Sequence, residues 1–453
     1  MVDSGNKPKP ADGHESAVGT RRTPFLGERL SNIASPYGLA MISYGFFLFA
    51  CLIPPSIYSH YMSEPDLMFL DPATILFYTL CVASFVAGAR VVQWLFPFPR
   101  SFADRRFETR ISPTVFLMVP LTVGIMVTAL SVFLLIAYNP DIIALLLAQQ
   151  GGEVKEVVAS EIASSFNLAP LMLTGIIWWA FWRSSDLDLR GWRNRLVKCA
   201  LVVAILGVIA GATLILSRDI LISIACGLAV LYVIRRDAKK AVSFRFVFGV
   251  GAAIAICVGV LFFGVAFLRG VDSWDGQVHT LIGYTAASYN RLAAVVNGSL
   301  RYPFANRGLY LSSFISFNHT WNRLLPLGRV MNWPSQLEVW GAEFGAVTRA
   351  GLDGTLIWSG AFGYIFSDLA WFSFPFIFGY GILYGLTWNW IRRGKVLGVV
   401  LYPAFAYCAL LWVAANSLLD SERAVVLVAA LILAGYERVF VRSPRNESAA
   451  ARG

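Results

Sequence analysis

Residues 246–268 read FVFGVGAAIAICVGVLFFGVAFL, a run without a charged, amide or histidine side chain. An α-helix needs about 20 apolar residues to cross the hydrocarbon core of a bilayer. A helix that is apolar on every side is buried either in a large protein core or in a membrane. The length of this run favours the membrane, and we interpret it as a transmembrane helix.

Similar apolar runs recur along most of the chain. Their number and length predict an all-α, polytopic membrane protein with about ten transmembrane helices and a large helical external loop. The expected spans are 38–57, 73–96, 113–138, 162–182, 196–216, 220–234, 246–268, 371–390, 397–417 and 424–440.

The composition agrees with this fold class. Of the 453 residues, 57% are hydrophobic and only 14% are charged, whereas soluble chains carry about a quarter of charged residues. A soluble enzyme, a fibre and a disulfide scaffold are therefore excluded. All six cysteines fall inside apolar runs, which indicates small buried side chains. They are Cys51, Cys81, Cys199, Cys226, Cys257 and Cys408.

The net charge of +10 is explained by basic cytoplasmic loops, so nucleic acid is not expected as a partner and the lipid bilayer is. Lys and Arg gather in alternate connections, as the positive-inside rule requires of cytoplasmic segments. Segment 58–72, on the opposite side, has three acids and no base. This alternation predicts that both termini are cytoplasmic. The basic groups are Arg100, Arg105, Arg106 and Arg110; Arg183, Arg190, Arg193, Arg195 and Lys198; Arg235, Arg236, Lys239, Lys240 and Arg245; and Arg392, Arg393 and Lys395.

The chain is thereby divided into five parts. They are a disordered cytoplasmic tail (1–36), transmembrane helices one to seven (37–268), an external loop with interfacial helices (269–370), transmembrane helices eight to ten (371–440) and a cytoplasmic tail (441–453). The external loop is rich in aromatic residues, which are typical of a segment lying against the bilayer surface. Within it, 281–300 has apolar residues at helical spacing and predicts one interfacial helix.

Several chemistries lack support. The chain has no G-x-x-x-x-G-K-[ST] loop for nucleotide phosphates and no helix with paired histidines for zinc, so neither a cofactor nor a metal is expected. Its four histidines are His14, in the tail, and His60, His279 and His319, which are all expected outside the membrane.

Two arginines lie at the external boundary of the spans. Arg218 is in the turn Ser217-Arg218-Asp219, and Arg269 closes the seventh span. Basic residues there run against the charge bias of the topology, and a guanidinium is well suited to phosphate oxygens. The diphosphate of a lipid-linked substrate would lie at this external boundary of the membrane. The alternatives are that Arg218 pairs with Asp219, caps a helix end or reaches the lipid headgroups.

Three segments resemble the Wzy-type oligosaccharide repeat-unit polymerases. LILSRDILISIACGLAVLYVIRRD (214–237) resembles their helix, Ser-Arg turn and second helix, and VLFFGVAFLRG (260–270) the span before their external loop. GAFGYIFSDLAWFSFPFIFGYGILYG (360–385) is similar to their loop exit, although the common Asp-aromatic-Gly is here Asp368-Leu369-Ala370. Arg349, eleven residues before Gly360, matches a motif of some members.

The resemblance implies transfer of a growing glycan from its polyprenyl diphosphate onto a new lipid-linked repeat unit. Arginines could stabilise the leaving diphosphate without a metal, and a carboxylate or histidine would accept the proton of the attacking hydroxyl. A flippase and a chain-length regulator are implied as partners, besides the polyprenyl-diphosphate-linked oligosaccharide itself. The substrate-binding candidates are Arg218, Arg269, Arg291 and Arg349; the catalytic candidates are Asp368, Glu343 and His319, followed by Glu338, Asp353 and Asp272.

Purely structural roles are the alternatives to these assignments. Asp368 could cap the eighth span, Asp353 fits a turn, and the pairs Gly207/Gly211 and Gly381/Gly385 have the spacing of close helix packing. Rival functions are an O-antigen-type ligase, a polyprenyl-phosphate-dependent glycosyltransferase using the acids of Glu64-Pro65-Asp66, and a lipid-linked oligosaccharide transporter.

Overall fold

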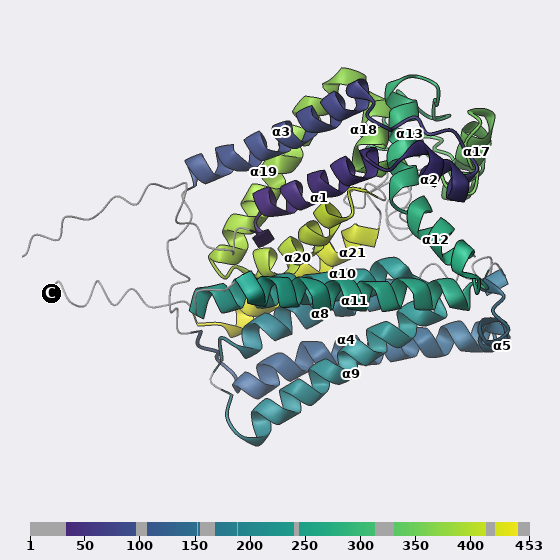
Figure 1. Ribbon diagram of the computed structural model, residues 1–453. Coiled ribbons are helices and arrows are strands. Elements are labelled where there is room, and N and C mark those ends of the chain that lie inside the picture. Colours follow the sequence, from purple (N-terminus) through teal and green to yellow (C-terminus); the bar gives the residue numbers. More distant parts are fainter. Residues whose placement is uncertain are drawn as a thin grey trace, which may run out of the picture.

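The computed structural model describes residues 33–96, 107–151, 153–154, 168–187, 189–239, 244–312, 330–413 and 422–442 (Figure 1). These residues form helices and, apart from an isolated bridge between Thr109 and Val441, no β-structure. The helices are α1 (Pro36–Cys51), α2 (Pro55–Met62), α3 (Pro72–Leu95), α4 (Pro113–Tyr138), α5 (Ile142–Leu147), α8 (Leu168–Ser184), α9 (Trp192–Leu214), α10 (Arg218–Lys239), α11 (Phe244–Leu268), α12 (Trp274–Gly283), α13 (Ala286–Val296), α17 (Gln336–Arg349), α18 (Gly360–Leu369), the 3₁₀-helix η2 (Ala370–Phe372), α19 (Ser373–Arg392), α20 (Val396–Leu410) and α21 (Glu422–Phe440).

The all-helical class predicted from the sequence is confirmed for the described residues. Four segments are long and apolar enough to cross a membrane, namely α3, α4, α9 and the pair α18–α19. A fifth is added if α1 and α2, which are bent by 90° relative to each other, count as one span. The criterion thus supports four or five of the ten expected spans, and the full count belongs to the proposal below.

Proline starts several of these helices. It occupies the first turn of α1, α2, α3 and α4, where a missing N–H costs nothing because that group has no partner within the helix. The side chains of Ser35 and Asp71 accept the exposed N–H groups of Gly38 and Thr74 at the starts of α1 and α3. These caps fix where the chain enters each helix.

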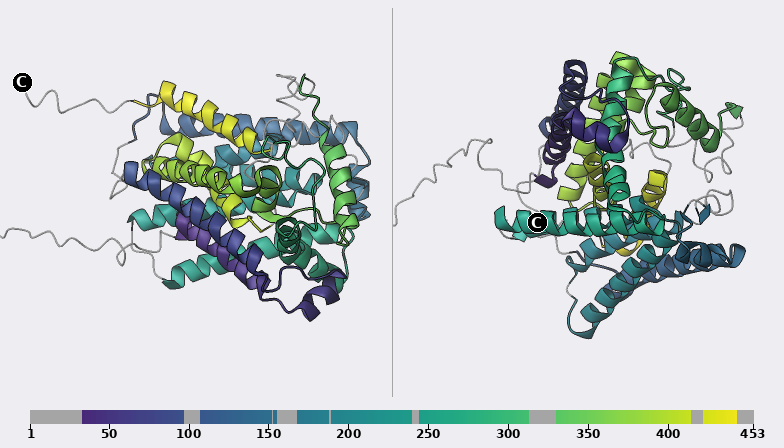
Figure 2. Two further views of the ribbon diagram at one scale, coloured as in Figure 1. Left: turned by 90° about the horizontal axis from the view of Figure 1, so that it is seen from above. Right: turned by 45° about the vertical axis from the view of Figure 1, so that its right-hand side comes forward.

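The long helices form two groups joined through α20 and α21. The first group pairs α3 with α19, and the second packs α4, α8 and α9 together, while α20 contacts α19, α8 and α10. Figure 2 shows the two groups on opposite sides of the molecule. The helices α2, α12, α13, α17 and α18 gather at one end of the bundle, on the right in Figure 1. This end carries the segment expected to be external.

Glycines bring α3 and α19 into backbone contact. A Cβ on Gly88 would lie 2.0 Å from the carbonyl oxygen of Phe378, and one on Gly381 would lie 2.0 Å from that of Phe85. Gly385 is also crowded, at 2.9 Å from Val92. The close packing predicted for Gly381/Gly385 is confirmed. The pair Gly207/Gly211 is confirmed in part: a Cβ on Gly211 would lie 3.0 Å from Cγ of Pro170, whereas the nearest neighbour of one on Gly207 would be 3.9 Å away.

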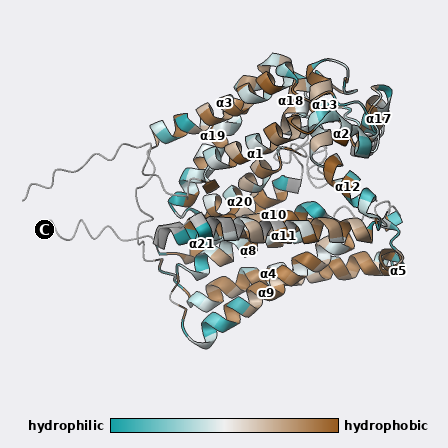
Figure 3. Ribbon diagram, viewed as in Figure 1, coloured by the Kyte–Doolittle hydropathy of each residue, from teal (hydrophilic) through white to brown (hydrophobic). Residues whose placement is uncertain are grey.

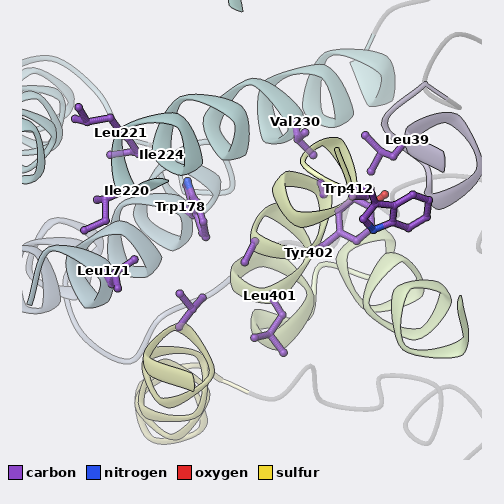
Figure 4. Packing of buried hydrophobic residues seen from close by; sticks show 14 of the residues in the cluster. Leu39, Leu171, Trp178, Ile220, Leu221, Ile224, Val230, Leu401, Tyr402 and Trp412 are labelled. Atoms are coloured by element: carbon purple, nitrogen blue, oxygen red, sulfur yellow. The ribbon is translucent and has the colours of Figure 1, made fainter. Parts of the chain in front are cut away.

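The core is aromatic where the two groups meet. The fully buried Trp178 of α8 lies against α10, and a Cβ on Gly227 would come within 2.4 Å of its ring. Figure 4 shows Trp178 beside Ile220 and Ile224, with Tyr402 and Trp412 farther along the same cluster. Only glycine at position 227 leaves room for this indole.

Large apolar side chains cover the outer faces of α4 and α9, which Figure 3 shows as hydrophobic along most of their length. Met126 and Phe133 of α4 and Leu206 of α9 are more than half exposed. An exposed apolar face of this extent is expected of helices in contact with lipid. Cys199 of α9 lies on such a face and is exposed, which corrects the expectation of burial, whereas Cys51, Cys81, Cys226 and Cys408 are buried as predicted.

The predicted interfacial helix over 281–300 is wrong in two respects. α12 ends at Gly283 and α13 begins at Ala286, so the segment is broken. Every residue of α13 from Ala286 to Val295 is buried, and the helix packs against α1, α3 and α18 rather than lying on a surface. The physical reason is that Arg291, which looked solvated or interfacial in the sequence, has an internal counter-ion.

Candidate functional site

The Arg218 side chain is buried, and two of its nitrogens have no hydrogen-bonding partner among the described residues. The chain leaves α9 through Leu216, whose φ of +50° turns the backbone sharply, and α10 starts at Arg218. Only 8% of Arg218 is exposed. Among the described residues, neither Nε nor Nη1 has a hydrogen-bond acceptor. A buried guanidinium cannot lose its charge, so this arrangement is unfavourable unless an anion is supplied.

Aromatic rings form the wall around this guanidinium. Its Cζ lies 4.3 Å from the ring centroid of Phe262 on α11 and 5.2 Å from that of Tyr284, the residue after α12. The two rings meet edge to face at 5.7 Å. Cation–π contacts of this kind stabilise a charge by about 0.5–2 kcal/mol and fix the orientation of the guanidinium plane. The N–H groups at its edge remain able to bind a hydrogen-bond acceptor.

Arg269 is the second cation of this site. Its Nη2 donates to the carbonyl of Leu216 at 2.6 Å, which places it beside the turn that carries Arg218. Its Nε is buried without a partner among the described residues. The two arginines predicted to bind a diphosphate are therefore brought together. We call Arg218, Arg269, Phe262 and Tyr284 the arginine site.

Asp219 does not neutralise the arginine site, so the alternative that it pairs with Arg218 is wrong. Its two carboxylate oxygens accept hydrogen bonds from the Tyr407 hydroxyl and from Nη2 of Arg423. Arg423 also lies over the Tyr407 ring at 4.9 Å. The acid next to Arg218 in sequence thus ties α10 to α20 and α21.

Arg291 has a structural role, which corrects its assignment as a substrate-binding residue. It is fully buried, and its side chain forms a bidentate ion pair with Glu64, at 3.1 Å to Oε1 and 3.0 Å to Oε2. Its other three N–H groups donate to the carbonyls of Leu356, Ala287 and Asp353. All five donors are occupied, so none is left for a ligand.

Glu64 is equally saturated. Besides Arg291, its oxygens accept from the Tyr58 hydroxyl, the Asn290 amide at 3.1 Å and the Asp353 N–H at 2.6 Å. This Glu64–Arg291 cluster joins the connection after α2 to α13 and to the segment before α18. A carboxylate held in this way is not available as a catalytic acid of the first external connection.

Asp368 anchors a neighbouring segment. Its Oδ1 accepts from the Gly308 N–H at 3.2 Å, and its Oδ2 accepts from the N–H groups of Tyr310 and Leu311 at 2.9 and 3.2 Å. Capping was the alternative considered for this residue, and it does bind backbone N–H groups. They belong to residues 308–311, however, and not to the start of α19, whose N-cap is Phe372.

Glu343 lies in a cluster of tyrosines. It is 2% exposed on α17, and Tyr310 is its polar neighbour. Tyr302, Tyr310 and Tyr364 pack with ring centroids 4.8–5.8 Å apart. Burial raises the pKa of the Glu343 carboxyl to about 8, and the Tyr310 hydroxyl partly offsets this rise. Among the described residues it forms no ion pair, so it is mostly protonated at neutral pH.

The remaining candidates are dispersed. Arg349 is exposed in the last turn of α17, and His319 lies outside the described residues. Asp353 accepts from the N–H and hydroxyl of Thr355, which confirms the predicted turn. Glu338 forms a capping box with Ser335 at the start of α17, and Asp272 is exposed.

Sequence reasoning missed the aromatic members of the site. Phe262, Tyr284 and Trp358 are scattered over almost a hundred residues, and no spacing links them to Arg218. The Trp358 ring lies 5.0 Å from that of Tyr284. The one available signal was the aromatic richness of the external segment, which pointed to the bilayer surface instead.

No group of three or more His, Cys, Asp or Glu side chains in the described part of the chain is arranged to hold a metal ion. The arginine site places two guanidinium groups beside an aromatic wall, an arrangement suited to binding an anion. Comparison of the chain with models of protein families, with curated proteins and with solved structures finds no match.

Proposed function

We propose that this protein is a membrane glycosyltransferase that polymerises polyprenyl-diphosphate-linked oligosaccharide repeat units into a surface or secreted polysaccharide. The observation that carries the proposal is the buried guanidinium of Arg218, which has no counter-ion in the part of the chain that the structure describes and stands beside Arg269. A diphosphate supplies the missing negative charge, and that charge increases when the diphosphate becomes the leaving group. Fixed cations then stabilise the transition state more than the ground state.

The proposed setting is the bacterial inner membrane, with ten spans and both termini in the cytoplasm. A helix lies over each of the ten expected apolar runs, which supports this count. The arginine site would then face the external side, where lipid-linked repeat units are polymerised. A flippase delivering those units and a chain-length regulator are the proposed partners.

The proton of the attacking sugar hydroxyl requires an acceptor, for which Asp368, Glu343 and His319 are the candidates. Glu343 can accept the proton only when it is ionised, and its raised pKa makes that form the minor one at neutral pH. Asp368→Asn, Glu343→Gln and His319→Gln each keep the size of the side chain while removing or weakening its basicity. The variant that is stable in the membrane but makes no polymer identifies the acceptor.

Of the rival functions, the polyprenyl-phosphate-dependent glycosyltransferase loses one of its two acids, because Glu64 is saturated by Arg291 and three other donors. Among the described residues, Asp66 accepts the N–H groups of Met68 and Phe69 through Oδ1 alone. A ligase would use the same arginine site on the same carrier lipid. The two differ in the phenotype of a deletion strain. Long polymer accumulates on the carrier lipid when a ligase is missing, and only single repeat units remain when a polymerase is missing.

The test measures polysaccharide chain length in a deletion strain complemented with wild type, Arg218→Ala or Arg269→Ala. Arg301→Ala is the matched control, since Arg301 is an exposed arginine of the external segment. We expect single-repeat product in the deletion strain, rescue by wild type and Arg301→Ala, and no rescue by well-expressed Arg218→Ala. Unchanged chain length in the deletion strain would refute the polymerase.

A further inference from the structure

Segment 353–359, just before α18, is held in place by hydrogen bonds with four side chains. The backbone of Asp353 donates its N–H to Glu64 and accepts from Nη2 of Arg291 at 2.7 Å. The carbonyl of Leu356 accepts from Nε of Arg291. A connecting segment with this many side-chain partners has lost most of its conformational freedom before any ligand arrives.

The next carbonyl is fixed as well. That of Ile357 accepts from the hydroxyls of Tyr302 and, at 3.1 Å, Tyr364. On the other side, the Leu356 side chain occupies the place that a Cβ of Gly283 would take, at 2.7 Å. This close approach seats the end of α12 directly on the segment. As a result, Tyr284 lies against Trp358.

Trp358 is the side chain through which this rigid segment reaches the arginine site. Its ring is partly buried and packs against both of the larger apolar clusters. It lies 5.0 Å from the Tyr284 ring, at an angle of 35°, and Tyr284 lies 5.2 Å from the Arg218 guanidinium. Arg218 thus contacts Tyr284, and Tyr284 contacts Trp358; the two aromatic residues belong to the external segment. A sugar bonded to a diphosphate held by Arg218 would have to lie along this row of side chains to contact the indole.

We infer that Trp358 stacks on the sugar ring bonded directly to the diphosphate, and that the Glu64–Arg291 cluster serves to position it. This inference rests on the proposed function. The C–H face of a pyranose is apolar and matches the broad face of an indole, whose N–H can still donate to a hydroxyl. Trp358 would therefore distinguish a glycan-bearing carrier from the bare carrier lipid that is released after transfer.

The test compares two ligands on the purified full chain in nanodiscs. The probes are undecaprenyl diphosphate and undecaprenyl diphosphate bearing one N-acetylglucosamine. We expect the wild type to bind the sugar-bearing lipid about tenfold more tightly, equivalent to about 1.4 kcal/mol. Trp358→Ala should abolish this preference without weakening the binding of undecaprenyl diphosphate, and Trp358→Phe should keep part of it. The control is Trp274→Ala, because Trp274 is 74% exposed on α12.

The possible failures are distinguishable. If Trp358→Ala keeps the preference, or loses both ligands equally, the sugar contact is refuted while the arginine site stands. If the wild type binds neither lipid, or Arg218→Met binds both as well as the wild type does, the proposed function fails and the inference fails with it.

Discussion

Two arginines of this protein are buried to a similar degree and are treated in opposite ways. Arg291 is surrounded by five acceptors, including both oxygens of Glu64. Arg218 has aromatic faces on its guanidinium and, at Nε and Nη1, no acceptor among the described residues. Burying a charge costs several kcal/mol unless it is paired. Glu64 compensates the charge of Arg291. No described residue compensates the charge of Arg218.

The difference separates a scaffold from a binding site. A saturated cation gains nothing from a ligand, because it would have to break existing hydrogen bonds to form new ones. An unsaturated cation gains a counter-ion, which the described residues do not supply to Arg218. The structure joins the two regions through segment 353–359, which Arg291 holds and from which Trp358 extends toward Arg218.

The largest effect is expected from breaking the scaffold. Glu64→Gln removes the charge that neutralises Arg291 while keeping the size of the side chain. An uncompensated buried charge should lower the free energy of unfolding by about 3–5 kcal/mol. The thermal unfolding midpoint of the purified protein in detergent measures this loss.

Glu108→Gln is the control for this substitution, because Glu108 is exposed and surface changes usually stay within about 0.5 kcal/mol. If Glu64→Gln were as mild as Glu108→Gln, the Arg291 cluster could not be the scaffold described above.

A second, smaller effect concerns a buried acid without an ion pair. Because the pKa of Glu343 is raised to about 8, the folded state retains a proton that the unfolded state has released. The free energy of unfolding should therefore fall as the pH rises from about 4.5 to 8, by on the order of a few kcal/mol, and then level off. Glu343→Gln should flatten this profile and be more stable than wild type above pH 8. The measurement is the unfolding midpoint as a function of pH; parallel profiles would contradict the assignment.

Glu343 differs from the two arginines in how it can respond to burial. A buried carboxyl group without an ion pair can take up a proton and become neutral, and the raised pKa of Glu343 favours this. A guanidinium has no such escape at any physiological pH. The missing partner of Arg218 among the described residues therefore points to a ligand more directly than the missing ion pair of Glu343 does. Only an anion can neutralise the guanidinium.

The sequence predicted the helices well and the roles of charged residues only in part. Apolar runs predicted each long helix, because in lipid the backbone N–H and C=O groups must be hydrogen-bonded within the protein and a helix achieves this within one segment. Charge bias also singled out Arg218 and Arg269, which do come together. Both signals are local or follow from topology, so they can be read along the chain.

Arg291 shows what local signals cannot give. Its neighbours in sequence suggested an interfacial helix, and its partner Glu64 lies more than two hundred residues away. Only the tertiary structure reveals that α13 is buried. The same holds for Trp358 and Tyr284, whose contact depends on the close approach of Gly283 and Leu356.

The smallest effect on stability is expected at Arg218, and it is the one that tests the comparison most directly. Arg218→Met removes a desolvated charge, whose burial costs several kcal/mol, and loses cation–π contacts worth about 0.5–2 kcal/mol, so it should not lower the stability. Arg291→Met, of the same size and chemistry, should instead cost about 3–5 kcal/mol, because it leaves Glu64 buried and unpaired.

Unfolding midpoints of both variants, measured with and without undecaprenyl diphosphate, give the result. We expect the ligand to stabilise the wild type by mass action and to have no effect on Arg218→Met. Equal destabilisation by the two substitutions would mean that Arg218 is part of the scaffold as well.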